Sequence, residues 1–198
     1  MNTSGDDIAY WVGLSLVPGL GGESYRKLLR AFGAPENIYS APHAALKDVV
    51  GSAVADGIRS GVDMADLGPL FGWLENEQNH IVTLADADYP QALLQIADPP
   101  PLLYVKGRLE LLNQPALAVV GSRNATPQGQ MNAESFSLSL SQSGLSIVSG
   151  LALGIDAAAH RGGLGGAASS IAVVGTGLDI VYPSRNHALA HELAHCGA

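Results

Sequence analysis

The sequence predicts an α/β protein in which a small helical domain precedes a parallel sheet. Two observations support this fold class. Residues 6–79 place apolar side chains at three- and four-residue spacing, which is typical of amphipathic helices. From residue 116 onward, short apolar runs alternate with helical patterns, and this alternation favours parallel strands with helices on the faces of the sheet. We therefore expect a helical domain over 1–79 and a sheet domain over 80–198.

The helical part is predicted to begin with two helices joined by a Pro-Gly-Leu-Gly turn at residues 18–21. The pattern resembles a helix-hairpin-helix, in which backbone N–H groups at the turn can contact DNA phosphates. Arg26, Lys27 and Arg30 are the neighbouring cations that would assist such contacts. A plain structural turn that uses glycine for its backbone freedom explains the same pattern, and we leave both interpretations open.

Strands are predicted where short apolar runs are bounded by glycine, proline or polar residues. A longer helix over 63–79 precedes the first of them. In the predicted helix over 127–143, Ala133, Phe136 and Leu140 share a face. The strands are expected at residues 81–84, 102–107, 116–120, 146–148 and 171–174.

The charge of the chain limits how it could bind nucleic acid. A net charge of −8 excludes a broad basic field that would attract a polyanion over a distance. The charge is uneven, because Asp and Glu outnumber Lys and Arg by 14 to 7 in residues 1–114 but only by 4 to 3 in residues 115–198. The nearly neutral second half can therefore still bind phosphate through a few well-placed groups.

The sequence predicts a cytoplasmic protein. Cys196 is the single cysteine, so no internal disulfide can form, and this fits a reducing compartment. No apolar run reaches the ~18 residues that a membrane helix needs. The acidic N-terminus lacks the basic start of a signal peptide.

Three glycine-bearing polar loops follow the strands of the second half, at Gly121, Gly150 and Gly175. They are spaced about one strand–helix–strand unit apart. Loops that follow parallel strands emerge at the same edge of a sheet, where such folds bind ligands. Free backbone N–H groups and the positive end of a helix dipole attract anions there. We therefore predict an anion site on this edge.

The first loop carries the side chains best suited to an anion. Gly121 lets a ligand approach the backbone, and Ser122 offers a hydroxyl. Arg123 suits a phosphate, although an ion pair with an aspartate of the neighbouring loops, Asp156 or Asp179, explains it too. Thr126 could contact the ligand or act as the N-cap of the helix that starts at Pro127.

Other polar residues near these loops are expected to be structural. We favour a helix-capping role for Asp156 over a ligand role. His160, four residues further on, is expected either to pack or to lie at the surface, without a catalytic role. The histidines at positions 187, 191 and 195 have a spacing that could bind a metal, but we favour a solvated helix face, so no metal site is predicted.

The sequence lacks the signature motifs of several enzyme classes. The first loop reads Gly-Ser-Arg-Asn-Ala-Thr, so it is missing the second and third glycines of a dinucleotide-binding motif. A Walker-type phosphate loop and a serine nucleophile in Gly-x-Ser-x-Gly context are also missing from the sequence. The site is predicted to hold a ligand without reacting with it, so we expect neither an enzyme nor a cofactor.

The motifs taken together resemble the DprA/Smf family, the DNA-processing protein A of bacterial transformation. They occur in the family's order over residues 80–190. The matching residues are Tyr89-Pro90, Asp98-Pro99-Pro100, Leu103-Tyr104-Val105-Lys106-Gly107, Gly121-Ser122-Arg123 with Thr126, Ser149-Gly150-Leu151-Ala152, Gly154-Ile155-Asp156, Ala159-His160, Gly175-Thr176-Gly177-Leu178-Asp179, Tyr182-Pro183 and Asn186.

The resemblance implies a SAM-like helical domain followed by an extended Rossmann-like domain. It implies a mediator of recombination that binds single-stranded DNA, protects incoming DNA in natural transformation and helps to load RecA recombinase. It also implies homodimers. The residues that it assigns to the DNA pocket are Gly121, Ser122, Arg123, Thr126, Ser149, Gly150, Gly175, Thr176, Gly177, Leu178 and, more weakly, Arg185.

The resemblance also implies that members of the family continue beyond the position where this chain ends. We therefore expect a C-terminally truncated sheet domain with an open strand edge, in which dimerisation and RecA loading are in question. The alternative function is an enzyme or sensor that binds a small nucleotide in the same crevice.

Overall fold

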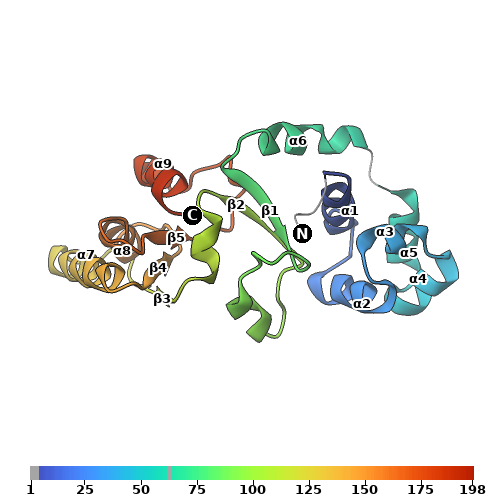
Figure 1. The fold of residues 1–198 in the computed structure, drawn as a ribbon, viewed down its shortest axis with the longest axis horizontal. Helices are drawn as coiled ribbons and strands as arrows, with labels where there is room; N and C mark the ends of the chain where they lie inside the picture. The colour runs from blue at the N-terminus through green and yellow to red at the C-terminus, as the bar shows by residue number, and fades with distance from the viewer. Residues whose placement is uncertain (1–4, 62–63) are drawn as a thin grey trace. The chain divides into compact units, whose positions relative to one another are not determined.

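Helices dominate the first part of the chain, and a parallel sheet organises its last part (Figure 1). This computed structural model describes residues 5–61 and 64–198. The early helices are α1 (Gly5–Ser15), α2 (Gly22–Phe32), α3 (Pro35–Ser40), α4 (His43–Val50), α5 (Ser52–Ser60), the 3₁₀ turn η1 (Met64–Leu67) and α6 (Gly68–Leu74). Within the described ranges, no helix combines the length and the apolar character that crossing a membrane requires.

The chain divides into two compact units. The first contains Met1–Glu77 and Ile81–Leu103, and the second contains Gln78–His80 and Tyr104–Ala198. This division differs from the expected boundary between residues 79 and 80, because the segment after residue 80 packs with the helices. Its elements are β1 (Asn79–Thr83), η2 (Gln91–Gln95) and β2 (Leu102–Lys106), and β1 and β2 form a two-stranded sheet.

The first unit packs its helices around a continuous apolar core. Tyr25 is fully buried, stacks on Trp11 with ring centroids 5.9 Å apart, and donates its hydroxyl hydrogen to the Trp11 carbonyl at 2.8 Å. Its hydroxyl is therefore satisfied inside the core. Tyr25 and Leu28 are the buried residues of α2. The core residues are Trp11, Leu14, Val17, Leu20, Tyr25, Leu28, Ile38, Ala41, Leu46, Ala55 and Ile58.

The cations beside the glycine-rich turn are largely engaged within the first unit. The Arg26 guanidinium forms an ion pair with Asp98 and donates to the Pro99 carbonyl at 2.9 Å, so it fixes the extended proline segment. Lys27 pairs with Glu23 at 2.9 Å on its own helix. These contacts favour the interpretation of residues 18–21 as a structural turn, because two of the three cations expected to contact phosphate, Arg26 and Lys27, already have partners.

The expected helix over 63–79 is wrong in its extent. Residues 62 and 63 lie outside the described residues, and helical structure over 64–74 is split between η1 and α6. Proline disfavours helical geometry in the residue before it and is accommodated in a first turn, so Pro69 marks the start of α6. The apolar positions still face inward, since Leu70, Phe71 and Leu74 pack against a buried cluster that includes Leu67.

The second unit is built on the predicted parallel sheet. Its strands are β3 (Ala116–Ala118), β4 (Ser146–Ser149) and β5 (Ser170–Ala172), in the order β3-β4-β5. Both neighbouring pairs are parallel, with Leu117 opposite Ile147 and Ile147 opposite Ser170. β3 and β5 are shorter than predicted and β4 is one residue longer. Pairing continues past the short strands, since Val119 donates to the Val148 carbonyl at 2.9 Å and Val173 to the Ser149 carbonyl at 2.9 Å.

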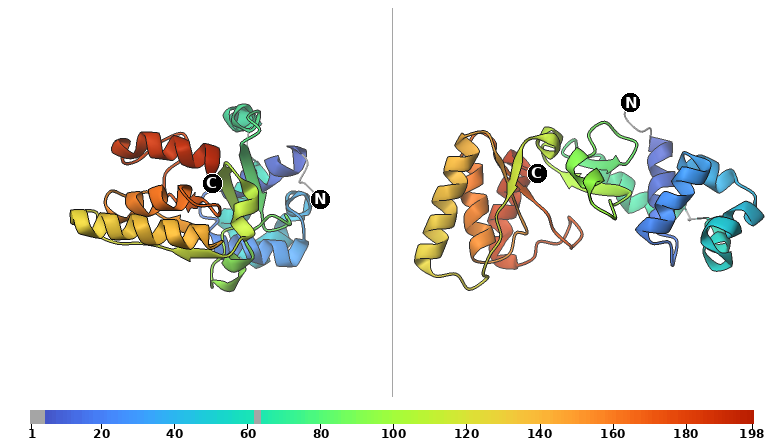
Figure 2. Two further views of the ribbon diagram at one scale, coloured as in Figure 1. Left: turned by 60° about the vertical axis from the view of Figure 1, so that its left-hand side comes forward. Right: turned by 90° about the horizontal axis from the view of Figure 1, so that it is seen from below.

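Three helices lie side by side in the second unit (Figure 2). They are α7 (Pro127–Gln142), α8 (Ile155–Leu164) and α9 (His187–Cys196), and short 3₁₀ turns occur at η3 (Leu109–Asn113) and η4 (Ser184–Asn186). The middle helix, α8, lies against the sheet at Gly163, where an added Cβ would be 2.9 Å from the Ile147 Cβ and 3.0 Å from the Ser170 Cβ. The glycine therefore permits a very close approach between helix and sheet.

The predicted apolar face of α7 is only partly buried, with Ala133 and Leu140 half-buried. Phe136 is 68% exposed, whereas Ser137 and Ser141 are fully buried. The reason is the tight packing of α7 on α8: a Cβ on Gly162 would meet the Glu134 carbonyl oxygen, so only small residues fit between the two helices. Periodicity of apolar residues could not reveal a helix contact made of serine and glycine.

The two outer strands of the sheet differ in their surroundings. Beside β5, Ala198 donates to the Ser170 carbonyl at 3.1 Å and accepts from the Ala172 N–H at 2.8 Å. Among the described residues, β3 pairs only with β4. The expected open strand edge is therefore found at β3.

Candidate phosphate-binding site

The loops after β3 and β4 meet at the carboxyl edge of the sheet, as predicted. The Ile155 N–H donates to the Ser122 carbonyl at 3.1 Å, which joins the first loop to the start of α8. The Ser149 hydroxyl donates to the Val119 carbonyl at 2.7 Å, and this side chain is buried. Ser149 therefore ties the ends of two neighbouring strands together and leaves no free hydroxyl at the surface.

The first loop packs closely on the residues that open α8. A Cβ on Gly121 would lie 2.7 Å from the Ile155 Cγ1, so this glycine is required by packing against Ile155. The Ser122 hydroxyl accepts a hydrogen bond from the Asn124 N–H at 3.1 Å, which closes a local turn. The geometry thus gives Gly121 and Ser122 roles in shaping the loop, while Arg123 extends from it as an exposed side chain.

Thr126 is the N-cap of α7. Its hydroxyl oxygen accepts from the Gly129 N–H at 3.1 Å, and Pro127 occupies the first turn of the helix. Of the two interpretations left open by the sequence, the structure shows the cap. Such a cap stabilises a helix by about 1 kcal/mol.

Asp156 fixes the second loop. Its Oδ2 accepts from the Gly150 N–H at 3.2 Å and from the Ala152 N–H at 3.3 Å. From the other side, the Asn186 amide donates to the Leu151 carbonyl at 2.8 Å and to the Ala152 carbonyl at 3.2 Å. Asp156 is therefore structural, but it binds the loop amides and is not the expected helix cap, since Gly154 is the N-cap of α8 and no side chain among the described residues caps this helix.

These contacts change the physical basis of the predicted anion site. The N–H groups of Gly129, Gly150 and Ala152 already donate to side-chain oxygens of the protein. They are therefore not the free donors that the sequence led us to expect at the helix N-termini. Arginine side chains, of which Arg123 is exposed here, are therefore the candidate cationic donors at this edge.

Arg123 lines a small pocket at this edge. The pocket has a volume of about 130 Å³ and is lined by Arg123, Gly150, Ala152, Leu153, Tyr182 and Pro183. Within the described residues Arg123 makes no ion pair, so the expected alternative of a pair with Asp156 or Asp179 is not found. An unpaired guanidinium beside a polar loop is a suitable donor for a phosphate group.

The third predicted loop lies apart from this pocket lining. Gly175, Thr176 and Gly177 are exposed, and Leu178 is half-buried. The Thr176 hydroxyl donates to the Ile180 carbonyl at 3.1 Å, and the Ile180 N–H donates to the Gly177 carbonyl at 3.0 Å. The loop is thus a local turn, and the chain reaches the pocket only further on, at Tyr182 and Pro183.

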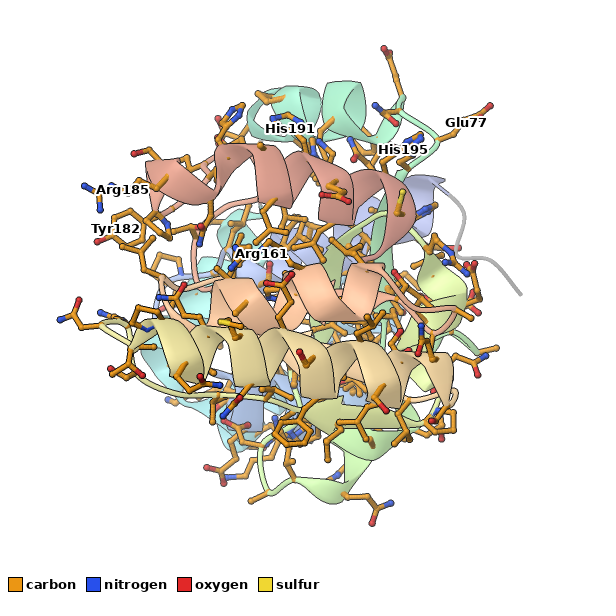
Figure 3. All side chains as sticks on the ribbon, turned by 90° about the vertical axis from the view of Figure 1, so that its left-hand side faces the viewer. Glu77, Arg161, Tyr182, Arg185, His191 and His195 are labelled. Carbon is orange, nitrogen blue, oxygen red and sulfur yellow. The ribbon has the colours of Figure 1, made fainter. Side chains whose placement is uncertain are left out.

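Sequence reasoning missed Tyr182 as a pocket residue. It noted Tyr182-Pro183 within a motif but gave neither residue a role. Figure 3 shows Tyr182 and Arg185 side by side, both extending from the same end of the unit. Arg185 is exposed, and the described residues include no ion-pair partner for it. The sequence does carry a signal for this position: Tyr182 is followed three residues later by Arg185, the only Lys or Arg after the third loop.

His160 lies beneath the site and is fully buried. Its Nδ1 is 2.7 Å from the Ser170 hydroxyl oxygen, and Ser170 donates its own hydrogen to the Ile147 carbonyl at 2.8 Å. Nδ1 must therefore carry the hydrogen, while Nε2 is buried without a hydrogen-bond partner. Burial lowers the pKa of His160 from 6.5 to about 4, against the opposing effects of Asp156 and a backbone contact with Ser149. Of the two expectations for His160, packing in the interior is confirmed.

We expect His160 to make folding stability depend on pH. Because its pKa is lower in the folded chain than in the unfolded chain, protonation favours unfolding as the pH falls below 6.5. The free energy of unfolding should drop by about 2 kcal/mol between pH 6.5 and 4.5. Urea unfolding over this range measures the effect. The carboxylates with lowered pKa values, Glu23 and Glu110, lose their contribution only below about pH 4.5.

His160→Gln removes the titrating group and is expected to flatten this dependence while lowering stability at pH 7. His80→Gln, at a partly buried position in β1, serves as the control and should keep the slope. An unchanged slope in His160→Gln would show that His160 is not the group responsible.

The histidines of α9 are mostly exposed to solvent. The Nε2 atoms of His187 and His191 are 3.3 Å apart, and His195 Nδ1 is 3.5 Å from the Gln78 amide nitrogen. The described part of the chain contains no group of three or more metal-binding side chains. His187, His191 and His195 thus do not form such a group among the described residues, although they recur every four residues along one helix.

The fold and the site together define an α/β protein with a candidate ligand site at the carboxyl edge of a parallel sheet. The family model of DNA recombination-mediator protein A matches residues 80–198. The chain therefore belongs to this family, which is the DprA/Smf family that the sequence motifs resembled.

Individual relatives agree with this assignment. Protein Smf of Synechocystis sp. is 38% identical over 193 residues, which cover 94% of this chain and 48% of the relative. DNA processing protein DprA of Streptococcus pneumoniae is 48% identical over 107 residues, which cover 54% of this chain and 38% of the relative. The chain thus spans about half the length of the first of these curated relatives and less of the second.

Two solved structures are similar to the chain. The crystal structure of DNA processing protein A from Streptococcus pneumoniae has a TM-score of 0.75 at 33% identity. The matched region covers 98% of this chain and 66% of the Streptococcus pneumoniae chain. DNA processing protein A from Helicobacter pylori, whose structure was described for its mode of binding single-stranded DNA, has a TM-score of 0.53 at 34% identity. The matched region covers 60% of this chain and 53% of the Helicobacter pylori chain. Both similarities support the α/β fold described above.

Proposed function

We propose that this chain binds single-stranded DNA at the carboxyl edge of its parallel sheet, with Arg123 holding a backbone phosphate. The observation that carries the proposal is the exposed Arg123 side chain, which lines the pocket without an ion-pair partner among the described residues. Membership of the DNA recombination-mediator family and the similarity to a DNA-binding relative support the same ligand.

The size of the pocket favours a strand over a small nucleotide. Ligand pockets that enclose a small molecule usually measure ~300–1,000 Å³. The pocket beside Arg123 measures about 130 Å³, which accommodates one phosphate-sized group but not a whole dinucleotide cofactor. A polymer held one group at a time at the surface fits this geometry, because most of each nucleotide can stay outside the pocket.

The mode of binding is set by a few charges. The chain has a net charge of −8, so attraction over long distances does not assist association. Arg123 and Arg185 are the exposed cations that extend from this edge. We therefore expect binding that uses a small number of phosphates and has a modest salt dependence.

The residues of the predicted pocket divide by role under this proposal. Arg123 contacts phosphate, and Arg185 contacts a neighbouring phosphate. Gly121, Ser122, Thr126, Ser149 and Gly150 hold the two loops in place through packing and hydrogen bonds. The loop over 175–178 remains a proposed contact for a longer strand.

We extend the proposal to the role that the family resemblance implies. In that role the protein protects incoming DNA during natural transformation, helps to load RecA recombinase, acts as a homodimer and catalyses no reaction. Support for this extension comes from family membership, because the chain spans only part of its relatives.

The length dependence of binding tests the proposed ligand. Calorimetric titration with a mononucleotide and with thymidine oligonucleotides of increasing length should give affinity that rises with length. Arg123→Ala should weaken binding of the oligonucleotide roughly 10- to 100-fold, since it removes one charged contact. Tight binding of the mononucleotide with no gain for longer strands would support the small-nucleotide alternative and contradict the proposal.

A control of equal charge separates a local contact from a general electrostatic effect. Arg161 lies on α8, is about half exposed and pairs with Glu134 at 3.2 Å. Arg161→Ala changes the net charge as much as Arg123→Ala does, but it removes no group from the pocket. Its affinity for the oligonucleotide should stay within about twofold of the unmodified protein.

A further inference from the structure

Tyr182 presents an unusually exposed aromatic ring at the pocket. Its relative exposure is 70%, although tyrosine rings are generally stabilised by burial. The ring lines the same pocket as the Arg123 guanidinium. An apolar surface beside an unpaired cation is the combination that single-stranded nucleic acids find in their binding proteins, where bases stack on aromatic side chains and phosphates bind arginine.

The backbone that carries Tyr182 is fixed from both sides. Asn186 is buried, and its N–H donates to the Pro183 carbonyl at 2.9 Å. Its side chain donates to the carbonyls of Leu151 and Ala152, which belong to the loop after β4. The turn after Tyr182 is therefore anchored to the same loop that Asp156 holds. A ring on an anchored turn loses little conformational freedom when a ligand stacks on it.

We propose that Tyr182 is a stacking platform for one nucleobase of the strand whose phosphate binds Arg123. This inference rests on the proposed function and adds to it a subsite for the base. The π-face of tyrosine accepts any base, so the subsite gives affinity without sequence preference. The hydroxyl group stays in water and has no part in the contact.

Arg185 extends beside Tyr182 from the same turn (Figure 3). Arg185 therefore offers a second exposed cation near a base stacked on Tyr182. The subsite therefore explains why the exposed cations of this edge accompany an exposed aromatic residue. Exposure of the Tyr182 ring contributes nothing to the stability of the fold, because an aromatic ring stabilises a protein when it is buried.

The test compares two ligands on three variants. Fluorescence anisotropy at fixed salt measures affinity for a thymidine oligonucleotide and for an abasic oligonucleotide of the same length. Tyr182→Ala should weaken binding of the thymidine strand roughly 5- to 100-fold and leave the abasic strand unchanged. Tyr182→Phe keeps the ring and should bind both strands like the unmodified protein.

Phe136→Ala is the matched control, because Phe136 is a similarly exposed aromatic residue on the outer surface of α7. It should leave both affinities unchanged. Quenching of 2-aminopurine fluorescence in the bound strand reports stacking directly and should disappear in Tyr182→Ala. Urea unfolding should give the same stability for all Tyr182 variants, since the ring is exposed.

The outcomes separate this inference from the proposed function. If the unmodified protein binds neither strand, the proposed function fails and the base subsite fails with it. If Arg123→Ala weakens binding while Tyr182→Ala does not, only the base subsite is overturned. An equal loss for thymidine and abasic strands in Tyr182→Ala would also overturn it, because the ring would then act on the backbone and not on the base.

Discussion

Replacing Gly154 by alanine is expected to destabilise the chain by about 3 kcal/mol and to weaken DNA binding together with it. Gly154 has φ of +81°, and a Cβ there would meet the Ser122 carbonyl oxygen and lie 2.7 Å from the Arg123 carbonyl oxygen. The methyl group must therefore push the first loop away from the start of α8. Urea unfolding measures the stability. Oligonucleotide titration measures the affinity, which should fall if Arg123 is displaced.

Gly51 provides the matched control for this substitution. It has φ of +80°, and no atom lies within 4 Å of the position that its Cβ would take. Gly51→Ala should cost only the backbone conformation, about 1–2 kcal/mol, and leave DNA binding unchanged. Equal losses of stability in the two variants would show that the loop after β3 does not press against Gly154.

Replacing Gly162 by alanine is expected to separate α7 from α8. A Cβ at this position would meet the Glu134 carbonyl oxygen and lie 2.9 Å from the Leu138 nitrogen. Backbone atoms cannot rotate away as a side chain can, so we expect a loss of about 2–3 kcal/mol in the free energy of unfolding. The higher helix propensity of alanine offsets part of this cost.

A glycine-to-alanine change at Gly72 measures the effect of helix propensity alone. It is exposed on α6, and an added Cβ there has open space around it. Gly72→Ala should be neutral or stabilising by up to about 1 kcal/mol. The account of the helix pair is contradicted if Gly162→Ala is as stable as Gly72→Ala in urea.

The architecture of the second unit could be predicted because its signals are local. Each strand is a short apolar run that stops at a glycine or polar loop, and each helix follows within a few residues. The parallel order of the strands and the meeting of the first two loops followed from this alternation. The family followed from the spacing of motifs over the same residues.

The details that failed depend on contacts between distant residues. The buried face of α7 is made by Ser137 and Ser141 against the glycines of α8, and no apolar period marks it. The helix expected over 63–79 was interrupted by Pro69. In both cases the sequence carried the information in small or restricting residues, which pattern analysis weighs less than large apolar ones.

In the candidate site, too, local sequence signals could be interpreted and contacts between distant residues could not. Arg123 could be selected from sequence because a cation in a polar loop after a strand has few structural explanations. The partners of the loop amides could not, since the contacts of Asp156 and Asn186 depend on how two separate segments fold around Leu151 and Ala152. Tyr182 escaped notice because the loop that carries it is exposed and irregular.

The salt dependence of single-stranded DNA binding tests the central claim most directly. The logarithm of the binding constant for a thymidine oligonucleotide should fall linearly with the logarithm of salt concentration, with a slope of about −0.7 for each phosphate neutralised. We predict that Arg123→Ala makes this slope less steep by about 0.7, whereas Arg161→Ala does not change it. An Arg123→Ala protein with the affinity and the slope of the unmodified chain would contradict the assignment of Arg123 as a phosphate contact.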